Sequence, residues 1–127
     1  MMFRILLAED ERGMREYLTR ALERSGYDVT AVDRGTAAIP LLENERFDLL
    51  LTDIVMPEMD GIELAQRAGE MAPDLRVMFI TGFAAVTLRA GESLPNARVL
   101  SKPFHLRELV REVDRMFERE VAPGGRG

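Results

Sequence analysis

The amino-acid sequence predicts an α/β domain, a doubly wound parallel sheet with helices on both faces. Short apolar runs alternate five times with stretches in which apolar residues recur at helical spacing. Continuous apolar runs of this length are typical of strands that are buried on both faces of a sheet. Strands that alternate with helices pair in parallel, because each helix carries the chain back to the start of the next strand. At 127 residues the chain has the size of one domain.

The first strand is expected at residues 5–8, the first helix at 11–25 and the second strand at 29–32. Gly26 follows the helix at the position where a left-handed residue commonly ends one. The helix is expected because four apolar residues recur on one face: Met14, Leu18, Ala21 and Leu22.

A second helix is expected at residues 34–45. Asp33 stands where its side chain can cap the first free backbone N–H groups of that helix. Pro40 lies inside it and lacks a backbone N–H, so it should kink or shorten the helix. The third strand covers residues 47–52 and ends at Asp53.

A turn-rich loop, residues 56–61, follows the third strand, and we expect Met56 and Met59 in it to be exposed. Next come a helix at 62–71, with Ile62, Ala65 and Ala68 inward, and a fourth strand at 77–80 that ends at Thr81. Residues 82–96 have only a weak helical pattern, which predicts a short, loosely held helix.

A brief fifth strand is expected at residues 98–100 and a last helix at 106–120. The tail, residues 121–127, is rich in glycine and is expected to be disordered. Five strands in this length favour the flavodoxin-like order 2-1-3-4-5, whose ligand crevice opens at the carboxyl ends of strands 1 and 3. The last helix has five apolar residues on one face: Leu106, Leu109, Val110, Val113 and Phe117.

The composition excludes several classes of function. Acidic residues outnumber basic ones by 22 to 17, which gives a net charge of −5 and argues against nucleic acid as the main partner. The chain has no cysteine and one histidine, so thiolate zinc sites and multi-histidine metal cages are ruled out. No apolar run approaches the ~18 residues of a membrane span, and we expect a cytoplasmic protein.

Five chemically active side chains follow the predicted strands, at the edge where the crevice opens. Carboxylates this close raise each other's pKa unless a cation lies between them, and a hard ion such as Mg²⁺ suits all-oxygen ligands. A phosphate-binding loop for a flavin is the rival, but residues 8–12 carry three acids that would repel it. The five residues are Glu9, Asp10, Asp53, Thr81 and Lys102.

This set of side chains could also bind a phosphoryl group. A carboxylate is a competent nucleophile towards a phosphoryl donor, and Asp53 is the best placed because its strand lies in the middle of the sheet. Positioning and charge neutralisation then supply most of the catalysis. Mg²⁺ would bridge Asp10, Asp53 and one phosphoryl oxygen, while Thr81 and Lys102 would hold the others.

Taken in order, five motifs resemble the receiver domain of two-component response regulators: Glu9-Asp10, Asp53, Met56-Pro57-x-Met59-Asp60-Gly61, Thr81-Gly82 and Lys102-Pro103. The resemblance covers about residues 2–119 and implies a receiver domain at 1–120. It implies that Asp53 takes a phosphoryl group from a histidine kinase or a histidine phosphotransferase. It also implies that Glu9, Asp10, Asp53 and the backbone carbonyl of Val55 hold Mg²⁺, that Thr81 and Lys102 contact the phosphoryl group, and that a cis bond precedes Pro103.

A narrower resemblance points to a subgroup of this family, the single-domain cell-cycle regulators of alphaproteobacteria. It rests on residues 50–61, 79–85 and 101–109. It implies a non-enzymatic adaptor that primes the ClpX–ClpP protease when unphosphorylated and is switched off by phosphorylation. The alternative is a phosphoryl shuttle, or phosphate sink, between histidine proteins. A Mg²⁺-dependent phosphatase is weaker, because Ile54 and Val55 follow Asp53 where such enzymes carry a second aspartate.

Three features depart from these patterns or admit two interpretations. Val99 stands where the family usually has Tyr or Phe, so an aromatic switch is in doubt there and another rearrangement must transmit the signal. His105 is interpreted as a surface or capping residue. Arginines recur every fourth residue on the last helix, where interleaved glutamates favour a solvated face over partner docking: Arg107, Arg111, Arg115 and Arg119.

Overall fold

The computed structural model describes residues 2–81, 97–101 and 105–121. In this part of the chain five strands form one parallel sheet in the order β2-β1-β3-β4-β5, which confirms the predicted fold. The strands are β1 (Arg4–Ala8), β2 (Asp28–Val32), β3 (Leu49–Asp53), β4 (Arg76–Thr81) and β5 (Arg98–Ser101). The helices are α1 (Arg12–Arg24), α2 (Gly35–Asn44), α3 (Gly61–Met71) and α5 (Leu106–Val121).

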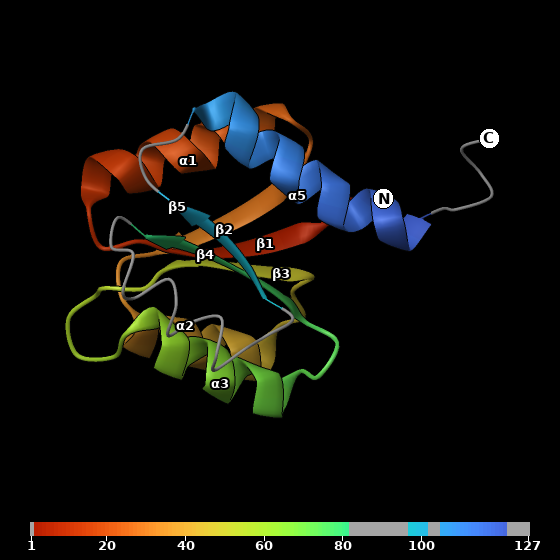
Figure 1. Cartoon of the computed structure of the whole chain (residues 1–127). Coiled ribbons are helices and arrows are strands. Elements are labelled where there is room, and N and C mark those ends of the chain that lie inside the picture. The colour runs from red at the N-terminus through yellow and green to blue at the C-terminus, as the bar shows by residue number, and fades with distance from the viewer. Residues whose placement is uncertain (1, 82–96, 102–104, 122–127) are drawn as a thin grey trace.

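The helices lie in two layers, with α1 and α5 on one face of the sheet and α2 and α3 on the other (Figure 1). Successive residues of a strand point to opposite faces, so each strand contributes to both cores. On β1, Ile5 and Leu7 pack with α1 and α5, while Leu6 and Ala8 pack with α2 and α3. This two-sided burial explains why the strands are continuous apolar runs.

The end of α1 follows the glycine rule. Gly26 adopts φ +97°, and the N–H groups of Gly26 and Tyr27 return to the carbonyls of Glu23 (3.0 Å) and Leu22 (3.2 Å). These two bonds form a Schellman motif, which satisfies carbonyls at the helix end. Leu22 and Tyr27 are both buried in the core on this face, so the turn also directs the chain into β2.

The start of α2 differs from the prediction. Its N-cap is Arg34, whose side chain makes no capping hydrogen bond, so the proposed cap by Asp33 is wrong. The Asp33 carboxylate instead accepts a 3.0 Å hydrogen bond from the Arg34 guanidinium, and this interaction lowers the pKa of Asp33. Pro40 does not end α2, which continues to Asn44.

Contacts from β5 and from the residues just before β1 and β2 hold α5 on the sheet. Arg98 on β5 pairs with Glu112 at 2.7 Å, and Tyr27 donates a hydrogen bond to Asp114. Phe117 stacks on Phe3 with ring centroids 4.0 Å apart. The inward face of α5 predicted from the sequence is confirmed, since Leu109, Val113 and Phe117 are buried in the core.

Some of the expectations fall on parts of the chain that the structure does not describe. The helix expected within 82–96 lies outside the described residues, as does the tail from residue 122 onward. Among the described residues, no helix has both the length and the apolar character that crossing a membrane requires.

Candidate functional site

The topology brings Glu9 and Asp53 to the same edge of the sheet. Glu9 follows the last residue of β1, and Asp53 is the last residue of β3. The two strands are neighbours, and Ala8 pairs with Thr52, so the next residue on each strand is one of these acids. Both side chains are nearly buried, at 1% and 8% exposed, whereas Asp10 beside them is exposed.

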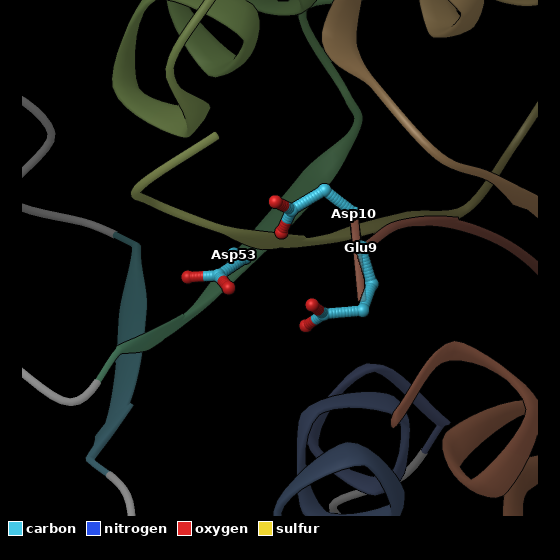
Figure 2. Close-up of side chains that lie close together, drawn as sticks. All are labelled: Glu9, Asp10 and Asp53. Carbon is cyan, nitrogen blue, oxygen red and sulfur yellow. The ribbon is translucent and has the colours of Figure 1, made fainter. Parts of the chain in front are cut away.

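Three carboxylates meet at this edge. One oxygen from each of Glu9, Asp10 and Asp53 lies within 4.8 Å of the other two. Figure 2 shows the carboxylates of Glu9 and Asp10 reaching from the end of β1 toward the side on which Asp53 lies. Three negative groups this close repel one another in a partly buried setting. Mg²⁺ binds oxygen ligands and usually keeps several water molecules. Three carboxylates, one of them exposed to solvent, therefore fit the predicted ion.

The turn between β1 and α1 is built by a residue that the sequence analysis did not single out. Glu11 is the N-cap of α1, and its carboxylate accepts hydrogen bonds from the N–H groups of Met14 (2.6 Å) and Gly13 (3.3 Å). Glu9 and Asp10 also stand just before this helix, where an acidic side chain can act as its cap. Because Glu11 performs it, the Glu9 and Asp10 carboxylates are left to face Asp53. The position of Glu11 directly before the apolar periodicity could have identified it.

Gly61 allows α3 to begin directly against the end of β3. A Cβ atom at this position would lie 2.1 Å from the backbone oxygen of Asp53. The Gly61 N–H donates to the Ile54 carbonyl at 2.8 Å, and Asp60 caps α3 by accepting from the Glu63 N–H at 2.8 Å. The Asp-Gly pair of the motif therefore joins a helix cap to a close backbone approach, and together they fix the position of Asp53.

The loop after Asp53 is more buried than predicted. Met56 and Met59 are only 8% and 7% exposed, so the expectation that they are exposed is wrong. Both pack into the core beneath α2 and α3, and a Cβ atom at Gly35 would lie 3.2 Å from the Met59 side chain. Glu58 between them adopts φ +72° and accepts a hydrogen bond from Thr36 at 3.2 Å. The loop is thus anchored to the start of α2.

The remaining predicted site residues are placed in part. Thr81 ends β4 and is buried, and its strand partner is Ser101, the residue before Lys102. Lys102 itself and the bond before Pro103 lie outside the described residues. Val55 is half exposed, and its N–H donates to the Asp53 carboxylate at 3.4 Å.

Val99 and three of the four arginines of α5 have described side chains, whereas Arg119 lies outside the described side chains. Val99 is the strand partner of Phe79 and packs against the core beneath α2 and α3. Arg115 pairs with Glu112 at 2.7 Å, as a solvated face would predict. Arg107 and Arg111 instead line a pocket with His105 and Glu108, and all four are exposed.

Comparison with known proteins agrees with this geometry. The model of the response regulator receiver domain family matches residues 5–114. The chain is 62% identical over 117 residues to the response regulator receiver protein CpdR of Brucella abortus, which covers 91% of this chain and 98% of CpdR.

Solved structures give the same result. A CheY-like receiver domain protein from Methanospirillum hungatei JF-1 superposes with a TM-score of 0.84 at 27% identity, over 91% of this chain and 94% of that one. The response regulator TrrA from Thermotoga maritima, crystallised in complex with Mg²⁺-BeF, gives 0.81 at 28% identity, over 91% and 99% of the two chains.

Proposed function

Because this chain belongs to the response regulator receiver domain family, we propose that it accepts a phosphoryl group on Asp53. The donor is a phosphohistidine of a histidine kinase or a histidine phosphotransferase. The observation that supports this most strongly is the meeting of the Glu9, Asp10 and Asp53 oxygens within 4.8 Å at the carboxyl edge of the sheet. Asp53 is the acceptor in this proposal because it ends a strand in the middle of the sheet. Its backbone oxygen also lies directly against Gly61 at the start of α3.

The reaction is a transfer between two nucleophiles. An Asp53 carboxylate oxygen attacks phosphorus, the nitrogen–phosphorus bond of the donor breaks, and an aspartyl phosphate and a histidine side chain result. The Val55 N–H already donates to one Asp53 oxygen, which orients the carboxylate. Thr81, the last residue of β4, and Lys102, the residue after β5, would hold the phosphoryl oxygens. The arrangement therefore works by positioning and by charge neutralisation.

Glu9, Asp10, Asp53 and the Val55 carbonyl would hold Mg²⁺. The ion, when bound, supplies positive charge that lets an anionic phosphoryl group approach an anionic pocket. The buried Glu9 carboxylate accepts a hydrogen bond from the Glu11 N–H at 3.1 Å, so it is fixed before any ion arrives. The exposed Asp10 leaves an open side through which a hydrated ion can enter.

Phosphorylation is tested with acetyl phosphate, a small donor that needs no kinase. Wild-type protein should gain the phosphoryl group in the presence of Mg²⁺. A phosphate-binding gel separates the phosphorylated protein from the unmodified protein. Asp53→Asn should gain none. The matched control is Asp33→Asn, since Asp33 follows β2 at the same edge but is paired with Arg34. Equal labelling of Asp53→Asn would contradict the assignment of the acceptor.

For the output, we propose that the unphosphorylated chain is an adaptor for the ClpX–ClpP protease in cell-cycle control, acting in the cytoplasm. The support is the 62% identity to CpdR over nearly the full length of both proteins. In this proposal the signal leaves through a protein surface, because phosphorylation adds nearly two negative charges at one edge of the domain and changes which partner it binds.

The adaptor role is tested by binding to the N-terminal region of ClpX. Unmodified protein and Asp53→Ala should both bind, and only the wild type should dissociate after treatment with acetyl phosphate and Mg²⁺. If no form binds while Asp53 still takes up phosphate, the adaptor proposal fails. The chain would then be assigned as a phosphoryl shuttle or phosphate sink.

A further inference from the structure

Arg15, in the first turn of α1, reaches back to the turn that carries Glu9 and Asp10. Its Nη1 donates to the backbone carbonyl of Glu9 at 3.0 Å and lies 3.5 Å from that of Asp10. Its own N–H donates to the Glu11 carbonyl at 2.9 Å, so the residue is fixed to the start of the helix. The Arg15 side chain is half-buried, which limits its freedom to leave this position.

These contacts constrain the two carboxylates unequally. Glu9 is buried and its carboxylate already accepts a bond from the Glu11 N–H. Asp10 is exposed, so its direction depends on the backbone that carries it. The Arg15 Nη1 donates to the Glu9 carbonyl and approaches the Asp10 carbonyl, so it restrains the two peptide units on either side of the Asp10 Cα. The direction in which Asp10 leaves the turn is thereby set.

The charge of Arg15 also acts at this edge. The pKa of Asp33 is lowered, first by the hydrogen bond with Arg34 and to a smaller extent by the charge of Arg15. The charge of Arg15 is therefore felt at the turn after β2, while its hydrogen bonds go to the turn after β1. The two contacts of its guanidinium described above go to backbone carbonyl oxygens of the turn after β1.

We propose that Arg15 is a positioning residue for divalent-cation binding: it holds the turn after β1 so that Asp10 faces Glu9 and Asp53. This inference rests on the proposed Mg²⁺ site. It predicts that loss of the guanidinium contacts to the turn weakens Mg²⁺ binding, although the removal of a positive charge would by itself strengthen it. Contacts that orient metal ligands from outside typically change metal affinity about tenfold or more.

Two variants separate positioning from charge. Arg15→Gln removes the charge and the guanidinium, whereas Arg15→Lys keeps the charge but replaces the planar guanidinium with an ammonium on a shorter stem. Arg12→Gln is the matched control, because Arg12 lies in the same helical turn, is exposed, and pairs with Glu16 at 3.1 Å. The dissociation constant for Mg²⁺ is measured by calorimetry on each full-length protein. The thermal unfolding midpoint in EDTA shows separately whether a variant has lost stability without metal.

Positioning predicts that both Arg15 variants bind Mg²⁺ about tenfold more weakly than wild type, while Arg12→Gln does not change. It also predicts that excess Mg²⁺ restores the wild-type rate of phosphorylation by acetyl phosphate. Tighter binding in Arg15→Gln with no change in Arg15→Lys would show an effect of charge alone and overturn the proposal, as would unchanged binding in both. Failure of the wild type to bind Mg²⁺ would instead reject the underlying site.

Discussion

At the amino end of the sheet Arg4 lies among acidic side chains, whereas at the carboxyl end three acidic side chains lie together. Arg4 pairs with Glu45 at 2.6 Å and with Asp28 at 3.5 Å, and its backbone N–H donates to Asp48 at 2.8 Å. Its guanidinium also covers the Phe47 ring at 4.6 Å. At the amino end, therefore, pairs of opposite charge connect segments of the fold.

The carboxyl end concentrates charge of one sign. Glu9, Asp10 and Asp53 approach within 4.8 Å, and the nearby Arg15 donates to backbone carbonyls. Such a cluster costs folding free energy, because like charges repel in a partly buried site. Under the proposed function, the amino end of the sheet contributes to stability and the carboxyl end to cation binding. Substitutions at the two ends should therefore respond differently to Mg²⁺.

The largest expected effect comes from Gly61→Ala at the carboxyl end. The new Cβ would lie 2.1 Å from the Asp53 backbone oxygen, so α3 must move away from β3. We expect a loss of about 3 kcal/mol in the free energy of unfolding, measured with urea, and a slower phosphorylation of Asp53.

Gly69→Ala is the control, because a Cβ atom in the same helix would meet nothing within 4 Å there. It should be neutral or stabilise the protein by up to about 1 kcal/mol. Equal effects of the two substitutions would show that the close approach of Gly61 does not matter.

Removal of Mg²⁺ should separate the two ends next. At a concentration about 100 times its dissociation constant, Mg²⁺ should raise the free energy of unfolding of the wild type by about 2.7 kcal/mol. Asp10→Asn should lose most of this gain, and in EDTA it should be as stable as the wild type or more so, because one repelling charge is gone. A full gain in Asp10→Asn would exclude this carboxylate as a ligand.

Arg4→Met at the amino end should behave in the opposite way. It removes partly exposed ion pairs and the contact with Phe47, so we expect a loss of about 1 kcal/mol in thermal or urea unfolding. The loss should be the same with Mg²⁺ and with EDTA, and it should shrink in high salt. A loss that depends on Mg²⁺ would break the distinction between the two ends.

The smallest effect is expected for Asp33, which is paired with Arg34 at the carboxyl end. The pair lowers the pKa of Asp33 from 3.8, so its stabilising contribution is present above that pH and is lost as the pH falls through the lower, folded-state pKa. Asp33→Asn should thus change the unfolding midpoint slightly at neutral pH and not at all at strongly acidic pH. A midpoint difference that grows in acid would contradict the direction of this shift.

The fold was predictable because each strand is a continuous apolar run and each helix carries an apolar face. The carboxyl edge followed from the strand order, which alone brings Glu9 and Asp53 together. Local competition between neighbouring polar groups was not predictable. Asp33 could pair with Arg34 or cap α2, and the ion pair forms. Met56 and Met59 follow a strand in a turn-rich loop, but the packing of that loop on α2 buries them.

Contacts made through backbone groups leave the weakest signal in a sequence. Gly61 was part of a motif, but its necessity comes from the Asp53 backbone oxygen, which is visible only in three dimensions. The role of Arg15 is equally hard to predict, because the sequence shows it only as one more charged residue of an amphipathic helix. Its acceptors are carbonyls of the preceding turn, and no side-chain pattern encodes them.

The most direct test of the account is to locate the phosphoryl group chemically. Protein treated with acetyl phosphate is reduced with borohydride, which converts an aspartyl phosphate into a stable product, and the modified residue is identified by mass spectrometry. If the proposed site is correct, Asp53 is modified in the presence of Mg²⁺ and almost unmodified in EDTA. Modification of another residue, or equal modification of Asp53 in EDTA, would contradict the claim that this edge of the sheet is a cation-assisted phosphoacceptor site.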